Sequence, residues 1–255
     1  MRIVSYNILD GGEGRADPLA EVIEAQRPDV VCLVEASDPA VIERIANRLK
    51  MDFVPAPARK KGASALLTHW TIRESINHGL LRDGLSKSLL EATVMDPGGA
   101  EWVFGVVHLH AHALEKDEAT REAELAVVLD VFAPHRAANR AHLICGDFNA
   151  NSPVQRIDPE KCKPSTRKEW AENGGQIPRR VVAKILESGY LDAMHAVRGD
   201  WAAEHGTFST QFPGQRVDYI FSYGIERSRL KDAWIEYDRL AKYASDHFPI
   251  GAEVS

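Results

Sequence analysis

The stretch at residues 142–150, H-L-I-C-G-D-F-N-A, limits most strongly what this chain can fold into. Its apolar run, 143–145, is followed at once by Gly146 and then by polar residues. A short apolar run that ends at a glycine is typical of a central strand in a covered sheet, and the polar residues after it enter a cleft at the sheet edge. We therefore expect Asp147 and Asn149 to share one crevice, although each alone is also a common cap or turn residue.

Two earlier stretches have the same design. Residues 2–7 alternate apolar and polar side chains up to Asn7, and residues 29–35, D-V-V-C-L-V-E, form a nearly continuous β-branched run that ends in Glu35. Both patterns predict strands, the second of them buried on both faces. Asn7 and Glu35 should thus lie at a sheet edge.

Helical spacing of apolar residues predicts helices at 18–26, with Asp17 as N-cap, and at 39–49. The first 50 residues therefore have the βαβα order of α/β proteins. A long amphipathic helix is predicted at 114–132 and a short one at 181–189, ended by a glycine.

Between these helices the pattern changes. Residues 63–68, 87–95 and 102–109 are predicted strands with no room for crossover helices between them, which indicates an antiparallel or mixed sheet. Residues 215–222 and 233–237 are also predicted strands. The long proline- and glycine-containing segment at 152–180 is expected to be a functional or mobile loop.

Length and composition favour one domain over residues 1–255, because α/β domains of this size are common. The net charge of −6 excludes a general basic surface for nucleic acid, so any phosphate recognition must be local. Three cysteines do not suggest a disulfide framework. No transmembrane segment and no secretory signal pattern are seen, so we expect a cytoplasmic protein. The oligomeric state is not indicated.

Polar residues of catalytic type occur at the ends of nearly all the predicted central strands. An unrelated chain would rarely place an acid, amide or histidine at so many of these positions. They are Asn7, Glu35, His108, Asp147, Asn149, Asp218, Asp246 and His247.

With six motifs in order, the chain resembles the endonuclease/exonuclease/phosphatase superfamily, which includes deoxyribonuclease I-like nucleases, abasic-site endonucleases, neutral sphingomyelinases and inositol polyphosphate 5-phosphatases. The motifs are S-Y-N-I-L at 5–9, L-V-E at 33–35, V-V-H-L at 106–109, G-D-F-N-A at 146–150, R-V-D-Y-I-F at 216–221 and S-D-H-F-P at 245–249. The resemblance implies a four-layer α/β sandwich, in which two packed mixed β-sheets are flanked by helices. It also implies a phosphoester hydrolase that uses a divalent cation, normally Mg²⁺, with Mn²⁺ as an alternative.

The resemblance also implies roles for the matched residues. Glu35 and the carbonyl oxygen of Asn7 would form the magnesium platform, with Asp246 joining directly or through water. Asp147 would orient or deprotonate the attacking water, and Asn149 would hold phosphate oxygens. His247, paired with Asp218, and His108 would face the phosphate as catalytic groups.

Two alternatives remain open at this stage. His108, His110 and His112 alternate at period two, so they suggest a histidine-rich zinc or manganese site. The family often has glutamine where this chain has Val34, and the Thr68-His69 pair also departs from its pattern, which leaves room for a non-catalytic binding module.

The substrate is open as well, among nucleic acid, a small phosphodiester, a phosphorylated metabolite and a lipid headgroup. Basic residues of the 152–180 segment are candidates for a substrate-binding rim, with Trp170 as a stacking surface, or for a solvated loop. They include Lys161, Lys163, Arg167, Lys168, Arg179 and Arg180.

Overall fold

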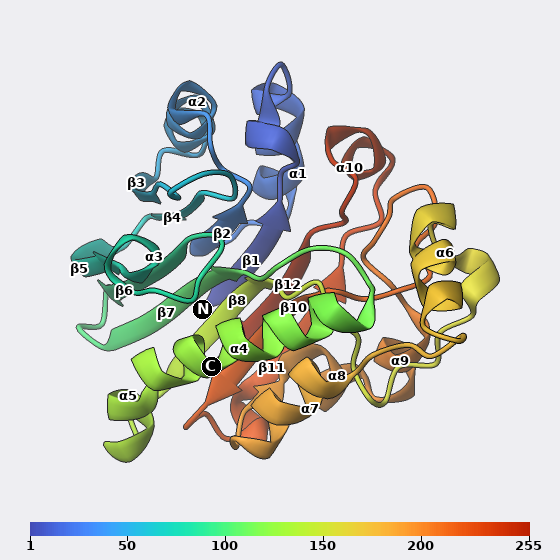
Figure 1. The fold of residues 1–255 in the computed structure, drawn as a ribbon. Helices are drawn as coiled ribbons and strands as arrows, with labels where there is room; N and C mark the ends of the chain where they lie inside the picture. Colours follow the sequence, from blue (N-terminus) through green and yellow to red (C-terminus); the bar gives the residue numbers. More distant parts are fainter.

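The structure is a computed structural model that describes residues 1–255, and its twelve strands form two six-stranded sheets (Figure 1). The first sheet has the order β11 (Leu230–Ile235), β12 (Ile250–Val254), β1 (Arg2–Asn7), β2 (Val30–Val34), β4 (Ser64–Thr68), β3 (Asp52–Ala56). The second has the order β5 (Thr71–Asn77), β6 (Leu89–Met95), β7 (Glu101–His108), β8 (His142–Asp147), β10 (Asp218–Tyr223), β9 (Leu191–Asp192). Only the pairs β1–β2 and β7–β8 are parallel. The prediction of two mixed sheets is confirmed.

Helices cover the outer faces of both sheets and complete the predicted four layers. The first sheet carries α1 (Ala16–Ala25) and α2 (Pro39–Leu49), and α10 (Arg239–Ala244) packs beside α1. The second carries α4 (Glu115–Val131), α5 (Ala133–Ala137) and α7 (Arg180–Glu187) (Figure 1). The other helices are α3 (His78–Leu81), α6 (Pro164–Glu172), α8 (Ala193–Arg198) and α9 (Asp200–Glu204), and the 3₁₀ turns are η1 (Asp10–Gly12), η2 (Pro159–Lys161) and η3 (Arg227–Arg229). No helix is both long enough and apolar enough to span a bilayer.

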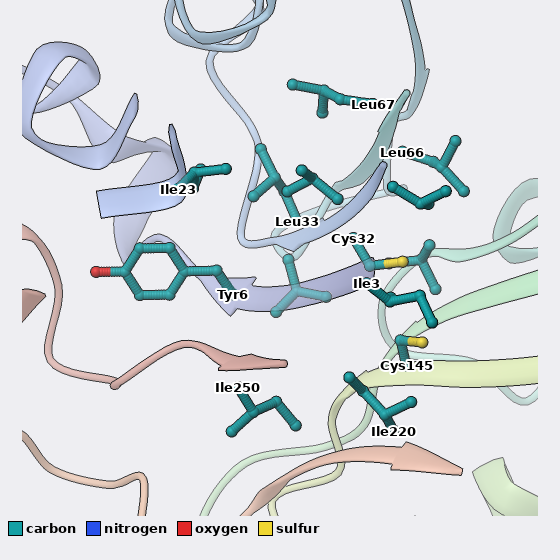
Figure 2. Close-up of a cluster of buried hydrophobic side chains, with 14 of the residues drawn as sticks. Ile3, Tyr6, Ile23, Cys32, Leu33, Leu66, Leu67, Cys145, Ile220 and Ile250 are labelled. Carbon is teal, nitrogen blue, oxygen red and sulfur yellow. The ribbon is translucent and has the colours of Figure 1, made fainter. Parts of the chain in front are cut away.

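The alternation of side chains along the central strands decides which residues face the seam between the sheets. Ile3, Cys32, Cys145 and Ile220 belong to one buried cluster that joins the two sheets, and Figure 2 shows them facing one another. Ile144, next to Cys145, instead packs in the second cluster, under α4 and α7. Side chains along a strand point alternately to its two faces. Every second residue after Ile3, Cys32, Cys145 or Ile220 on the same strand therefore also faces the seam.

The usual N-cap residues predict the start of α2 but not the start of α1. The Asp38 side chain accepts a hydrogen bond from Ala40 N at 2.9 Å, and Pro39 follows it at the first helical position, as expected for a helix start. In contrast, α1 begins at Ala16, so the prediction of Asp17 as its N-cap was wrong. Asp17 lies in the first turn and pairs with Arg44 of α2 at 2.5 Å.

Several elements were not predicted, and three of them show why. β3 and β5 were not predicted, because both are edge strands with several exposed side chains and a weak apolar pattern. The segment at 152–180, expected to be a loop, contains helix α6, whose buried residues are only Thr166 and Trp170. So few buried positions leave little helical periodicity to detect.

Candidate active site

Four strands deliver a polar residue to the seam at the same edge of the molecule. Asn7 lies on the same face of β1 as Ile3, and Asp147 lies on the same face of β8 as Cys145. His108 is the last residue of β7 and also faces the seam. Asp218 is the first residue of β10 and not, as predicted, a residue at the end of a strand. β10 runs antiparallel to β8 and pairs Asp218 with Asp147, so the start of one strand meets the end of the other.

Asn7 links the two sheets through its side-chain amide. Its Nδ2 donates to Asp147 Oδ2 at 3.1 Å and to Glu35 Oε1 at 3.2 Å. Its Oδ1 accepts from Leu9 N at 3.0 Å, and its main-chain oxygen accepts from the Ser245 hydroxyl at 2.7 Å. Each oxygen of Asn7 thus accepts one hydrogen bond and its Nδ2 faces the carboxylates as a donor, while its role as a metal ligand stays a prediction.

Asp147 is the centre of the cluster and is 1% exposed. Its Oδ1 accepts from Asn149 N at 2.8 Å, and its Oδ2 lies 3.2 Å from Asn149 Nδ2, 3.5 Å from His108 Nε2 and 3.8 Å from His247 Nε2. Burial raises the pKa of Asp147, His247 lowers it and Asp218 raises it, and the net result is a pKa of about 6. A carboxylate that titrates near neutral pH in a cluster of donors has the properties of a general base.

His247 and Asp218 form a buried pair, with Nδ1 of the histidine 2.9 Å from Oδ2 of the aspartate. Burial lowers the pKa of His247, but Asp218 and then Asp147 outweigh it and raise that pKa to about 10. The histidine is therefore an imidazolium at neutral pH, with its Nδ1 proton on Asp218 and its Nε2 proton facing Asp147.

His108 behaves in the opposite way because of a neighbour that the sequence analysis did not identify. Lys87, which precedes β6, brings its Nζ into contact with His108 Nε2 and donates to Leu109 O at 3.0 Å. Burial, Lys87 and His247 together hold the pKa of His108 well below its usual value. His108 is thus a neutral acceptor for Lys87, and Lys87 is a partly buried cation near the carboxylates.

Glu35 occupies the open side of the cluster. It follows β2 in the left-handed region, with φ of 58°, and its Oε2 accepts from Asp10 N at 2.8 Å. A cleft of about 320 Å³ opens there and has no hydrophobic lining residue. It is lined by Asp10, Glu35, Ser37, Lys60, Lys61, Gly62, Lys87 and His108.

The donor set in this cleft fits a hard divalent cation. The side chain of Glu35 is 25% exposed and supplies carboxylate oxygen beside open space, which a cation that retains water ligands requires. Asp246, whose buried Oδ1 has no hydrogen-bond partner, lines a different cavity, with Leu9 and Ser245. Asp147, Asp218 and His247 also have potential ligand atoms within 4.8 Å of one another. That group is buried and internally hydrogen bonded, which suits proton transfer better than a hydrated cation.

The expected histidine-rich metal site does not form. β7 ends at His108, so the alternation that would align His110 and His112 with it stops there. His110 Nε2 lies 3.1 Å from Asp117 Oδ1, and His112 Nδ1 lies 3.0 Å from Glu169 Oε1. The three imidazoles therefore have separate partners.

The two arginines expected to bind substrate also have partners outside the cluster. Arg179 donates to the main-chain oxygens of Ser152 and Gln155, which ties the start of α7 to the loop after β8. Arg180 pairs with Glu115 at 2.5 Å and Glu122 at 2.8 Å on the surface of α4. The lysines that do line the cleft are Lys60 and Lys61, from the segment between β3 and β4, and Lys87, which precedes β6.

A sequence model described as the Endonuclease/Exonuclease/phosphatase family matches residues 4–247 of the chain. The chain is also 24% identical, over 268 residues, to a DNA-(apurinic or apyrimidinic site) endonuclease of Dictyostelium discoideum, covering 100% of this chain and 70% of the relative.

Solved structures share the fold. An AP endonuclease from Archaeoglobus fulgidus superposes with a TM-score of 0.73 at 18% identity, covering 100% of this chain and 99% of that one. A 3′ phosphatase from Neisseria, bound to a product DNA hairpin, gives a TM-score of 0.71 at 21% identity with the same coverage. The fold predicted from the motif order is therefore the fold of these proteins.

Proposed function

Because this chain belongs to the endonuclease/exonuclease/phosphatase family and is thus a metal-dependent phosphoric ester hydrolase, we propose that it cleaves phosphodiester bonds of nucleic acid or nucleotides. The observation that carries this proposal is the cluster in which a buried carboxylate, an imidazolium and a neutral histidine meet at one seam. We also propose that residues 1–255 work as one domain, because both sheets contribute to that cluster.

Glu35 is the proposed holder of Mg²⁺, with Mn²⁺ as an alternative, and Asp246 is its proposed partner. A divalent cation there would polarise the phosphate and offset the negative charge that develops on it. Asn7 has a different proposed role, since its Nδ2 holds the carboxylates of Glu35 and Asp147 in fixed orientations.

Asp147 is the proposed base for the attacking water. Its pKa of about 6 leaves it ionised at neutral pH yet basic enough to accept a proton in the transition state. Asn149 fixes it through both its main-chain and side-chain nitrogens. Asn149 Nδ2 also donates to Leu109 O at 3.1 Å, so its proposed contact with a phosphate oxygen requires this amide to exchange partners.

Positive charge for the phosphate comes from two directions. His247 presents an Nε2 proton toward Asp147, and Asp218 keeps the imidazolium charged. Lys87 supplies an ammonium from the other side, held by His108 and Leu109 O. Such preorganised donors in a buried site stabilise a pentacovalent phosphate without rearrangement of solvent.

These groups are those of a hydrolase, so the cluster gives no support to the non-catalytic binding module that Val34 and Thr68-His69 suggested. Neither departure removes a member of the cluster. Thr68 donates to Asp29 O at 2.8 Å, and His69 contacts Lys50 O at 3.2 Å, so both belong to the packing around β4.

A substrate panel tests the proposal. The purified protein is incubated with abasic duplex, single-stranded DNA, bis(p-nitrophenyl) phosphate, sphingomyelin and an inositol polyphosphate, each with Mg²⁺, Mn²⁺ or EDTA. We expect metal-dependent cleavage of the nucleic acids and of the aryl diester, and none in EDTA. Cleavage of sphingomyelin or the inositol polyphosphate alone would contradict the proposed substrate class, and equal rates in EDTA would contradict the metal requirement.

A further inference from the structure

Glu124 of α4 is a buried carboxylate outside the catalytic cluster, and the proposed reaction does not use it. It is 2% exposed, and no side-chain nitrogen of a lysine, arginine or histidine lies within 4.0 Å of it. Its Oε1 accepts from Ser86 N at 3.0 Å and from the Ser86 hydroxyl, and its Oε2 accepts from His110 N at 2.7 Å. A buried carboxylate without a counter-ion costs folding free energy, so stability alone does not account for a charge at this position.

The two segments that Glu124 joins continue neighbouring strands beyond the point where their pairing ends. The last pair of the antiparallel β6–β7 ladder is Leu89 opposite Val107. Three further steps along each chain reach Ser86 and His110, which the same register would place opposite each other. By accepting one main-chain N–H from each, the carboxylate joins the two chains where the ladder no longer does.

The contact between Lys87 and His108 lies between this carboxylate and the end of the ladder. Lys87 directly follows Ser86, and its Nζ contacts His108 Nε2 and donates to Leu109 O at 3.0 Å. Gly62 lies against the lysine stem, since a Cβ there would be 2.7 Å from the Cγ and Cδ atoms of Lys87. The side chain has little lateral room, so its direction depends on how the main chain beside it is held.

The charge of Glu124 also acts on Lys87. Burial lowers the pKa of Lys87, and Arg121 adds a smaller lowering. Three carboxylates oppose this effect, and they belong to Asp147, Glu35 and Glu124. Asp147 is the proposed base and Glu35 the proposed metal holder, so a proton or a cation offsets their charges during the reaction. Glu124 is the one whose charge stays constant, which a neutral glutamine would not supply.

We propose that Glu124 is a positioning residue of the hydrolase, which holds the main chain on both sides of the Lys87–His108 contact and so aims the Lys87 ammonium at the phosphate. The proposal rests on the proposed function and adds a residue that touches neither substrate nor metal. Glu124→Gln keeps the size of the side chain but replaces one acceptor oxygen with a donor, so one main-chain N–H loses its partner. A misplacement of about 1 Å can cost about 100-fold in rate, and because one bond remains we expect kcat to fall about ten-fold and KM to change less than about three-fold.

A double-mutant cycle with Lys87→Met tests whether Glu124 acts through Lys87. With bis(p-nitrophenyl) phosphate and Mg²⁺, Glu124→Gln should lower kcat about ten-fold in wild type but less than about two-fold in the Lys87→Met background. Glu118→Gln is the matched control, because Glu118 is an equally buried carboxylate of α4 that bonds Val181 N and Arg121 instead. It should lose stability and keep kcat within about three-fold. Equal losses in both backgrounds, or equal losses in the two α4 variants, would overturn the proposal.

The position of Lys87 is also measured without turnover. The proteins are acetylated with acetic anhydride in EDTA, and mass spectrometry of peptides compares Lys87 with the exposed Lys184. We expect Lys87 to react at least about five-fold faster in Glu124→Gln than in wild type, because its amine is released from its contacts and is less often charged. Glu118→Gln should leave the rate unchanged. If Glu124→Gln does not fold, Ser86→Ala removes one donor to the carboxylate and should give about a two-fold increase.

The outcomes separate this proposal from the proposed function. If labelling of Lys87 accelerates but the wild type cleaves no phosphodiester with Mg²⁺ or Mn²⁺, the hydrolase is wrong while Glu124 still holds Lys87. If the wild type cleaves the diester, and Glu124→Gln changes neither the labelling rate nor kcat more than Glu118→Gln does, the positioning role is overturned while the hydrolase stands.

Discussion

Two groups of buried charges lie on either side of the second sheet, and they differ in how completely they are paired. Beneath α4, Arg121 donates to Glu118 Oε2 at 2.9 Å and to His110 O at 3.0 Å. The other Glu118 oxygen accepts from Val181 N at 3.0 Å. The Glu124 oxygens accept from Ser86 N at 3.0 Å and from His110 N at 2.7 Å. Every carboxylate oxygen in this α4 cluster has a donor.

At the seam the pairing is incomplete and the charges oppose one another. His108 Nδ1 and Asp246 Oδ1 are buried without partners, and Asp218 lies close enough to Asp147 to raise its pKa. Where every buried polar group has a hydrogen-bond partner, the chain is held in one conformation. The α4 cluster holds the loop after His108 in this way. Incomplete pairing leaves groups with shifted pKa values and free hydrogen-bonding capacity, which catalysis requires.

Among the proposed variants, Asp147→Asn is expected to differ most from wild type in activity. The amide cannot accept the proton of the attacking water, so kcat should fall on the order of 10³-fold. The melting temperature should not fall. The folded state raises the pKa of Asp147 above its unfolded value, so ionisation above pH 6 costs folding free energy, and the neutral amide avoids that cost.

Steady-state kinetics with the aryl diester and thermal unfolding at pH 7.5 measure both effects. A clear loss of stability in Asp147→Asn would place Asp147 with the α4 cluster and break the comparison.

Arg121→Met should have the opposite profile. It leaves Glu118 buried without its counter-ion, which typically lowers the free energy of unfolding by about 3–5 kcal/mol. Urea denaturation measures this loss. Well below its melting temperature the variant should retain kcat within about ten-fold, because Arg121 acts on the cluster only through the loop at 110–112.

Glu118→Gln combined with Arg121→Met is the matched control, since it removes both charges. The double variant should recover part of the lost stability. A kcat as low as that of Asp147→Asn in a fully folded Arg121→Met protein would show that the α4 cluster belongs to the catalytic machinery.

The smallest effect is expected for His142, which belongs to neither cluster. It tests what burial does to a histidine that forms no ion pair. Its Nδ1 donates to Arg140 O at 2.8 Å, and its Nε2 lies 2.7 Å from Tyr190 OH. Burial lowers its pKa to about 4. The unfolded chain therefore binds the proton first, and stability falls as the pH is lowered from about 6.5 to 4, by about 2 kcal/mol.

Urea denaturation of wild type and His142→Leu at pH 7 and pH 4.5 isolates this contribution, because all other groups titrate in both proteins. The difference in unfolding free energy between the two proteins should change by most of that amount. If that difference were the same at both pH values, the pKa of His142 would not change on unfolding.

Much of the fold and of the site follows from local sequence. The order of strand-end motifs predicted two mixed sheets, and period two along β1 and β8 explains why Asn7 and Asp147 meet. The role of Asn7 could not be predicted, because it depends on Leu9 and Ser245 occupying its oxygens. Metal and catalytic roles of these residues stay predictions.

Other features depend on contacts that no local pattern reports. Lys87 precedes a strand, where a lysine is usually solvated, and it reaches His108 and Leu109 because β6 lies beside β7. The alternative of a site shared by His108, His110 and His112 is not formed, because β7 and its period-two alternation end at His108. The orientation of Arg180 depends on α7 packing against α4, and that of Arg179 depends on main-chain oxygens of the loop after β8. The sequence context of the two arginines does not show these contacts.

The pairing of β1 with β12 has a consequence for the order of folding. It places Arg2 opposite Glu253, so the first sheet closes only when segments about 250 residues apart have met. Contacts at such separation form slowly, because the intervening chain must first lose its freedom. Asp246 and His247 lie just before β12. Refolding experiments should therefore show native helix content returning before hydrolytic activity, with activity reporting the final docking step.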